Sequence, residues 1–155
     1  MSAAALDRAW IASHLPHRGA MSLLDEIVAW DGERLHARAR GQGQPDHPLR
    51  RGGELPIASA IEYGAQAVAA HGALLAGDAS PPAAGYLASV RSVAFHAERL
   101  DDVASALDVE VRRMGDGAGG MLYDFRVSAL GRTLAEGRVA IVLDADRVPA
   151  GMRAR

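Results

Sequence analysis

The sequence of 155 residues contains no cysteine and no lysine, so all 17 basic residues are arginine. The absence of thiols excludes disulfide scaffolds, thiolate zinc sites and cysteine nucleophiles. Neither Gly-rich nucleotide fingerprint is present, and Ser59 lacks the G-x-S-x-G context of a serine hydrolase. The His, Asp and Glu residues show no zinc-ligand spacing, so we predict neither a metal nor a cofactor.

Neither positive nor negative residues are in large excess. The formal net charge is -2, which argues against nucleic acid as a main partner. Hydrophobic residues make up 49% and charged residues 23%, as in an ordinary globular protein. The first eight residues lack the basic and apolar runs of a signal peptide, so we expect a cytoplasmic protein. We expect one domain over residues 1–155, with a core at about 15–145 and a loose C-terminal tail.

The most informative segment is the apolar run from Leu55 to Gly77. Pro56 suits a first helical turn, and the many alanines favour a helix. Its length approaches that of a membrane span, but Glu62, Gln66 and other polar residues make it a weak candidate. A helix that is apolar on nearly all sides is more simply one buried inside a globular fold.

Most of the remaining sequence predicts β-strands. Residues 23–30 and 35–40 flank an Asp-Gly turn, which predicts a hairpin. Strands follow at 85–95, from Leu107, from Met121 and at 133–143, with a Gly-rich connection at 115–120 and a turn at 130–132. A sheet must cover its apolar face, and the long helix is the available cover. We therefore predict an α+β hot-dog fold, a curved antiparallel sheet around one central helix.

Glu62 is the strongest catalytic candidate because it is the only charged residue in the long apolar run. Burial of a carboxylate raises its pKa, and a raised pKa suits proton transfer near neutral pH. The alternative is that Glu62 reaches solvent or an arginine. Gln66 lies on the same helical face and either lines the site or hydrogen-bonds within the core.

Two of the six histidines are candidates for a partner base. His17 lies in a loop after a proline, and His47 lies in the polar loop before the long helix. His14, His36 and His96 are expected to be solvated. His71, on the long helix, is expected to be a hydrogen-bonded core or interface residue.

Three segments together resemble the FabZ/FabA family of 3-hydroxyacyl-acyl-carrier-protein dehydratases. Residues 15–25 resemble the opening L-P-H-R-x-x-x-L-L-x-D, and residues 61–66 resemble L-E-x-x-A-Q on the central helix. Residues 85–95 are similar to the strand that follows. The layout is most similar to the dehydratase-like proteins of aryl polyene clusters (ApeP-type).

The resemblance implies a homodimer, or a heterodimer with a related hot-dog protein, that acts on acyl chains bound to acyl carrier protein. In such a site Glu62 protonates the departing β-hydroxyl and a histidine removes the α-proton. The resemblance also assigns a substrate-binding set, with backbone N–H groups near Ile57 polarising the thioester: Gln66, Pro56, Ile57, Gly85 and Tyr86.

One departure concerns the histidine that precedes the helix in the family. Residues 52–56 read GGELP, so this histidine is absent, and His17 or His47 is its possible replacement. Three functions therefore remain open: a dehydratase, an acyl thioesterase in which Glu62 activates water, and a silent partner of an active paralogue. The acidic carrier protein is expected to dock on nearby cations: Arg18, Arg50, Arg51 and Arg91.

Overall fold

A computed structural model describes residues 5–17, 19–77, 86–117 and 120–142. Within them lie two α-helices, two short 3-10 turns and six strands. The helical elements are α1 (Arg8–His14), η1 (Gly19–Met21), η2 (Ile57–Ser59) and α2 (Ala60–Ala76). The strands are β1 (Glu26–Trp30), β2 (Arg34–Ala39), β3 (Tyr86–Phe95), β4 (Leu107–Gly117), β5 (Gly120–Ala129) and β6 (Arg132–Val142).

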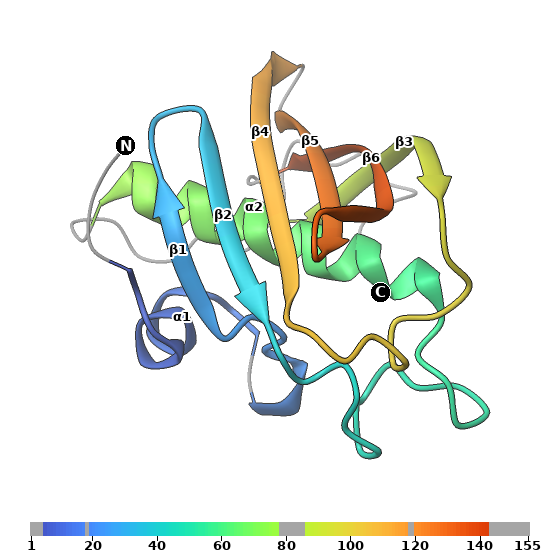
Figure 1. The fold of residues 1–155 in the computed structure, drawn as a ribbon. Coiled ribbons are helices and arrows are strands. Elements are labelled where there is room, and N and C mark those ends of the chain that lie inside the picture. Colours follow the sequence, from blue (N-terminus) through green and yellow to red (C-terminus); the bar gives the residue numbers. More distant parts are fainter. Residues whose placement is uncertain (1–4, 18, 78–85, 118–119, 143–155) are drawn as a thin grey trace, which may run out of the picture.

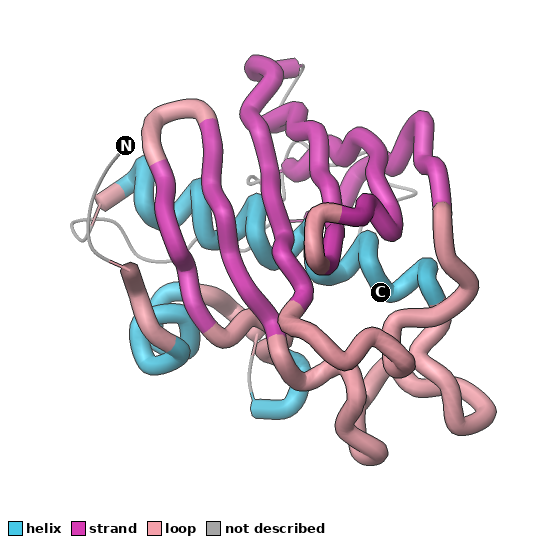
Figure 2. The backbone as a smooth tube through the Cα atoms, viewed as in Figure 1, coloured by secondary structure: helices cyan, strands magenta, loops and turns pink. Residues whose placement is uncertain are grey.

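All strands form one antiparallel sheet in the order β1-β2-β4-β5-β6-β3. Helix α2 crosses behind this curved sheet, and α1 lies beside the β1–β2 hairpin (Figure 1). Figure 2 shows the same arrangement coloured by secondary structure, with the long helix α2 in cyan behind the magenta strands. The prediction of a curved antiparallel sheet around one long helix is confirmed. None of the described helices is long and apolar enough to cross a membrane.

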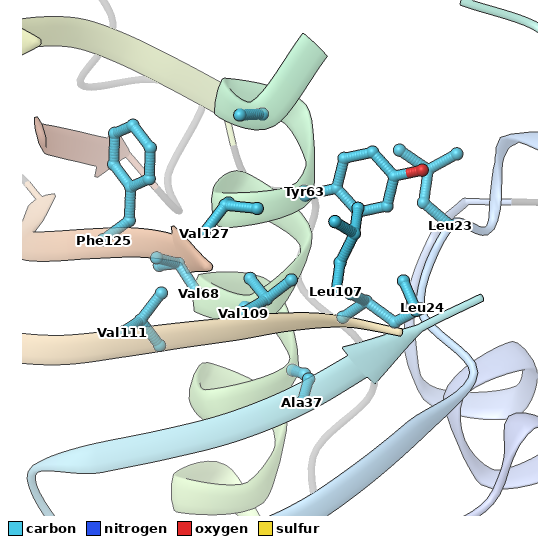
Figure 3. Packing of buried hydrophobic residues seen from close by; sticks show 14 of the residues in the cluster. Leu23, Leu24, Ala37, Tyr63, Val68, Leu107, Val109, Val111, Phe125 and Val127 are labelled. Atoms are coloured by element: carbon cyan, nitrogen blue, oxygen red, sulfur yellow. The ribbon is translucent and has the colours of Figure 1, made fainter. Parts of the chain in front are cut away.

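The alternation read from the sequence matches the burial of β4 and β5. Val109, Val111, Phe125 and Val127 are buried and point toward α2, where Val68 is also buried (Figure 3). The residues between them face outward, as period-two alternation requires. The core therefore fills the space between the sheet and the helix.

Local chemistry explains the turns. Asp31 Oδ1 accepts hydrogen bonds of 2.8 Å from the N–H groups of Glu33 and Arg34, which closes the β1–β2 turn. Between β5 and β6, Leu130 and Gly131 both have positive φ, the conformation of a tight hairpin turn.

The structure differs from the sequence-based prediction at the β4–β5 connection. The predicted Gly-rich connection at 115–120 is partly strand, since Gly115 pairs with Leu122 and Gly117 with Gly120. Glycine does not prevent pairing where the partner backbone approaches closely. The predicted C-terminal tail after Asp144 lies outside the described residues.

His71 is a satisfied core residue, as predicted. Its Nε2–H donates to the Asp31 carbonyl oxygen at 2.7 Å, so its Nδ1 accepts from the Tyr123 hydroxyl, also at 2.7 Å. These bonds tie α2 to the β1–β2 turn and to β5. Burial lowers the pKa of His71, against the opposing effect of the Asp31 carbonyl.

Candidate active site

The segment that leads into α2 is fixed by the loop after β3. Ile57 N–H donates to the Glu98 carbonyl at 3.1 Å, and Leu55 N–H donates to Asp101 Oδ1 at 2.8 Å. The Asp101 side chain is 6% exposed and forms an ion pair with Arg99, whose hydrogen bond holds the pKa of that carboxyl low. In the sequence, the only signal for Asp101 is the charged run at 98–102.

The structure brings together Glu62 and His17. Glu62 lies in the first turn of α2, and its Oε1 is 3.2 Å from His17 Nε2. Both side chains keep a partly open side, with exposed fractions of 31% and 26%. A carboxylate oxygen only accepts, so His17 Nε2 carries the proton and, in a neutral ring, Nδ1 keeps its lone pair. That Nδ1 is buried and has no hydrogen-bond partner among the described residues.

Gln66 links Glu62 on α2 to the segment that follows His17. Its Nε2 donates to Glu62 Oε1 at 3.2 Å and to the Met21 carbonyl at 2.7 Å, and its Oε1 accepts from Leu23 N–H at 2.9 Å. The side chain is completely buried. Both of its N–H donors are used, so Gln66 has none left to offer a substrate.

The segment that follows His17 is also held from the opposite side by α1. Arg8 donates to the Ser22 carbonyl at 2.8 Å and forms a 2.9 Å ion pair with Asp25. Thus Arg8 and Gln66 fix residues 21–25 between the two helices. Arg8 has no sequence motif that marks this role, because two of its three partners are backbone carbonyls.

The expectation of a raised pKa for Glu62 is wrong. Burial does push the pKa up, but the hydrogen bonds from His17 and Gln66 outweigh it and leave the pKa below its ordinary value. The sequence revealed the apolar surroundings of Glu62 but not the donors that reach it. At neutral pH the carboxyl is therefore ionised, with one oxygen bound by two donors.

His47 does not contact Glu62. Its Nδ1 accepts from Leu49 N–H at 3.1 Å, so its Nε2–H donates to the Tyr63 hydroxyl at 2.9 Å. The residue is buried, and burial together with the nearby Arg50 lowers its pKa. Both ring nitrogens are therefore occupied by bonds that fix the polar loop onto α2.

The other predicted substrate-binding residues are placed as follows. Ile57 does not offer the expected free N–H, because that group is bonded to Glu98, and Pro56 has no N–H. Tyr86 begins β3, and its side chain lies outside the described part of the chain, as does all of Gly85.

The four predicted docking cations are not equivalent. Arg50 is held inside its own loop, where it donates to the carbonyls of Gln44, Gly43 and Gly53. Its side chain is only 17% exposed, because these bonds fold it against the loop backbone. Arg51 and Arg91 are exposed, and Arg18 lies outside the described residues.

Comparisons with known proteins agree with this architecture. A family model described as ApeP-like, ApeP dehydratase, matches residues 9–149. Among solved structures, the dehydratase heterocomplex ApeI:P from Xenorhabdus doucetiae has a TM-score of 0.75 and 22% identity, covering 86% of this chain and 90% of that chain. AziG from S. sahachiroi has a TM-score of 0.57 and 20% identity, with coverage of 78% and 90%. Zebra fish thioesterase superfamily member 2 has a TM-score of 0.60 and 10% identity, with coverage of 88% and 95%. No curated protein matches the chain.

The sheet around a single helix and these structural likenesses define a hot-dog protein, so the predicted fold class is confirmed. The family model covers most of the chain, and the chain therefore belongs to the ApeP-like dehydratase family. The resemblance seen in the three sequence motifs is confirmed with it.

Proposed function

We propose that this chain dehydrates 3-hydroxyacyl thioesters on acyl carrier protein to trans-2-enoyl thioesters, in fatty acid or aryl polyene biosynthesis. The observation that carries the proposal is the Glu62–His17 pair, 3.2 Å apart and partly open, at the start of α2. Membership of a dehydratase family supports the reaction class.

The lowered pKa of Glu62 favours a different division of roles from the one implied by the sequence. An ionised carboxylate is ready to act as a base, so Glu62 removes the α-proton through Oε2, which no described residue hydrogen-bonds. The carbon–oxygen bond at the β-carbon then breaks, and the same proton passes from the Glu62 carboxyl to the leaving hydroxyl as water. The products are one enoyl thioester and one water, and Glu62 is ionised again.

A bound acyl chain strengthens this base. The Glu62 side chain is 31% exposed without substrate, and covering it removes water that stabilises the charged form. Desolvation raises the pKa of a carboxyl and so increases its basicity. His17 donates to Oε1 throughout and leaves Oε2 without a hydrogen-bond partner among the described residues.

His17 is therefore the partner histidine in this proposal. It contacts Glu62 directly, whereas the ring of His47 is occupied by Tyr63 and Leu49. Gln66 acts as a positioning residue, since its bonds join Glu62 to the segment after His17.

A related hot-dog chain is the proposed dimer partner. Strand β3 is an outer strand of the sheet and leaves one edge open to pairing with another chain. The structural relative ApeI:P is a dehydratase heterocomplex, which supports a heterodimer here. The histidine missing at residues 52–56 favours a second candidate function, a silent subunit that needs an active partner.

The third candidate is acyl-thioester hydrolysis. An ionised Glu62 is also suited to activate water, and zebra fish thioesterase superfamily member 2 has a similar fold. Incubation with 3-hydroxyacyl and saturated acyl thioesters separates the three functions. An enoyl product supports the dehydratase, a free acid from both substrates supports the hydrolase, and turnover only with a partner chain supports the silent subunit.

Carrier docking is proposed at the exposed Arg51 and Arg91. Arg51→Glu and Arg91→Glu should raise KM for a carrier-bound substrate and leave KM for a small thioester unchanged. Arg132→Glu, an equal charge change at the exposed start of β6, is the control. Equal effects on both substrates would count against docking at these arginines.

A further inference from the structure

Charged residues follow a regular pattern on the outer face of the sheet, the face that points away from α2. Each of β4, β5 and β6 presents two charged residues of opposite sign, two positions apart. They are Glu110 and Arg112, Asp124 and Arg126, and Glu136 and Arg138.

The strand register aligns these residues in two rows. One row, the Arg112 row, consists of Arg112, Asp124 and Arg138, which are direct cross-strand partners. The neighbouring Glu110 row consists of Glu110, Arg126 and Glu136. On each strand the two rows therefore have opposite charge.

Three of these six charged residues have an ion-pair partner within the chain, and the other three do not. Arg138 forms a 2.8 Å ion pair with Asp124, and Glu136 lies 3.1 Å from His96. Glu110, Arg112 and Arg126 are exposed and have no side-chain ion pair or hydrogen bond among the described residues. Arg112 instead has a like charge, Arg34, as its direct partner on β2, an arrangement that is destabilising.

The two rows match each other under a two-fold rotation. We consider an axis that lies in the plane between two stacked sheets, perpendicular to the strands and midway between the rows. Rotation about it places the Glu110 row of a second copy over the Arg112 row of the first, strand by strand. Arg112 then faces Glu110, Asp124 faces Arg126, and Arg138 faces Glu136, and each pair occurs twice.

We propose that this face binds a second copy of the same chain, sheet against sheet, through this reciprocal charge matching. A trough of about 920 Å³ lies over the face and is lined by all six residues, which gives room for the side chains of a second sheet. The six charges sum to zero, so the face does not favour a uniformly acidic partner over a basic one. The contact leaves the β3 edge free and is independent of the proposed reaction.

The test uses two complementary variants in analytical ultracentrifugation. Wild-type chains should associate at about 0.05 M salt and dissociate at about 1 M, where screening acts within about 3 Å. Glu110→Arg places an arginine opposite Arg112 of the second copy, and Arg112→Glu places a glutamate opposite Glu110 of the second copy. Each variant alone should therefore associate roughly tenfold or more weakly than wild type.

An equal mixture of the two variants should regain the association, because the arginine introduced in one chain then faces the glutamate introduced in the other. Arg51→Glu, with the same change in net charge as Arg112→Glu but on a loop, should associate like wild type. Two results would overturn the proposal. One is a wild-type mass that does not depend on salt, and the other is a mixture that associates no more strongly than either variant alone. If the charges served only within one sheet, the variants would change the urea midpoint without changing the mass.

Discussion

Replacing Gln66 by methionine tests how the site is held together. The substitution keeps the length of the side chain but removes its bonds to Met21, Leu23 and Glu62. The buried Leu23 N–H and the partly buried Met21 carbonyl lose their partner, and a loss of this kind costs about 1–3 kcal/mol, less where water can reach the group. The variant should therefore be destabilised by about 2–5 kcal/mol, which a domain with about 5–15 kcal/mol of stability can survive folded. Urea denaturation measures this change.

The same variant should raise the pKa of Glu62. One of the hydrogen bonds that lower this pKa comes from Gln66, and burial then faces less opposition. Gln42→Met is a matched control, because Gln42 is also buried and also donates to two carbonyls, those of Val103 and Ser105. Titration of the carboxyl carbon of Glu62 by NMR should show a shift only in the Gln66 variant. An unchanged Glu62 titration, or an equal shift in the Gln42 variant, would refute the reasoning.

Two further predictions concern stability. His47 and His71 are buried with pKa values below the ordinary 6.5, so stability should be complete above pH 6.5 and fall as the pH drops below it. A urea midpoint at about pH 5.5 that equals or exceeds the midpoint at about pH 7.5 would contradict this. Gly64→Ala should destabilise by about 1–3 kcal/mol, since its Cβ would lie 2.9 Å from the Phe125 ring. Gly72→Ala, with its nearest neighbour at 3.6 Å, should gain up to about 1 kcal/mol in thermal or urea unfolding. Equal changes in stability for the two substitutions would show that the contact with the Phe125 ring does not cause the destabilisation.

The sequence was sufficient to predict the long helix and most of the strands with their faces, although not the strand pairing within residues 115–120. Alternation in β4 and β5 indicates which side chains face the core, and the long, mostly apolar run of α2 indicates burial on several sides. Glu62 could be singled out because burying a charged side chain in such a run is energetically costly unless the charge is paired or hydrogen-bonded. These patterns involve residues that are close in the sequence, so they can be recognised without knowledge of the tertiary contacts.

The partners of Glu62 could not be predicted in the same way. His17 and Gln66 approach it through tertiary contacts, and Gln66 is held by backbone atoms of Met21 and Leu23, which have no sequence signature. The direction of the Glu62 pKa shift depends on these donors, so composition alone gave the wrong sign. Arg50 looked like a surface cation for a related reason, because only the loop conformation directs its guanidinium at three carbonyls.

The central claim, that Glu62 paired with His17 transfers the proton in dehydration, is tested most directly by the rate of enoyl thioester formation in Glu62→Gln. The substitution keeps the shape and the hydrogen bond but removes the base, so the rate should fall by at least about 100-fold with the fold intact. The measurement uses a 3-hydroxyacyl carrier substrate, with the partner chain present if the single chain is inactive. Enoyl formation by the variant at the wild-type rate would contradict the account.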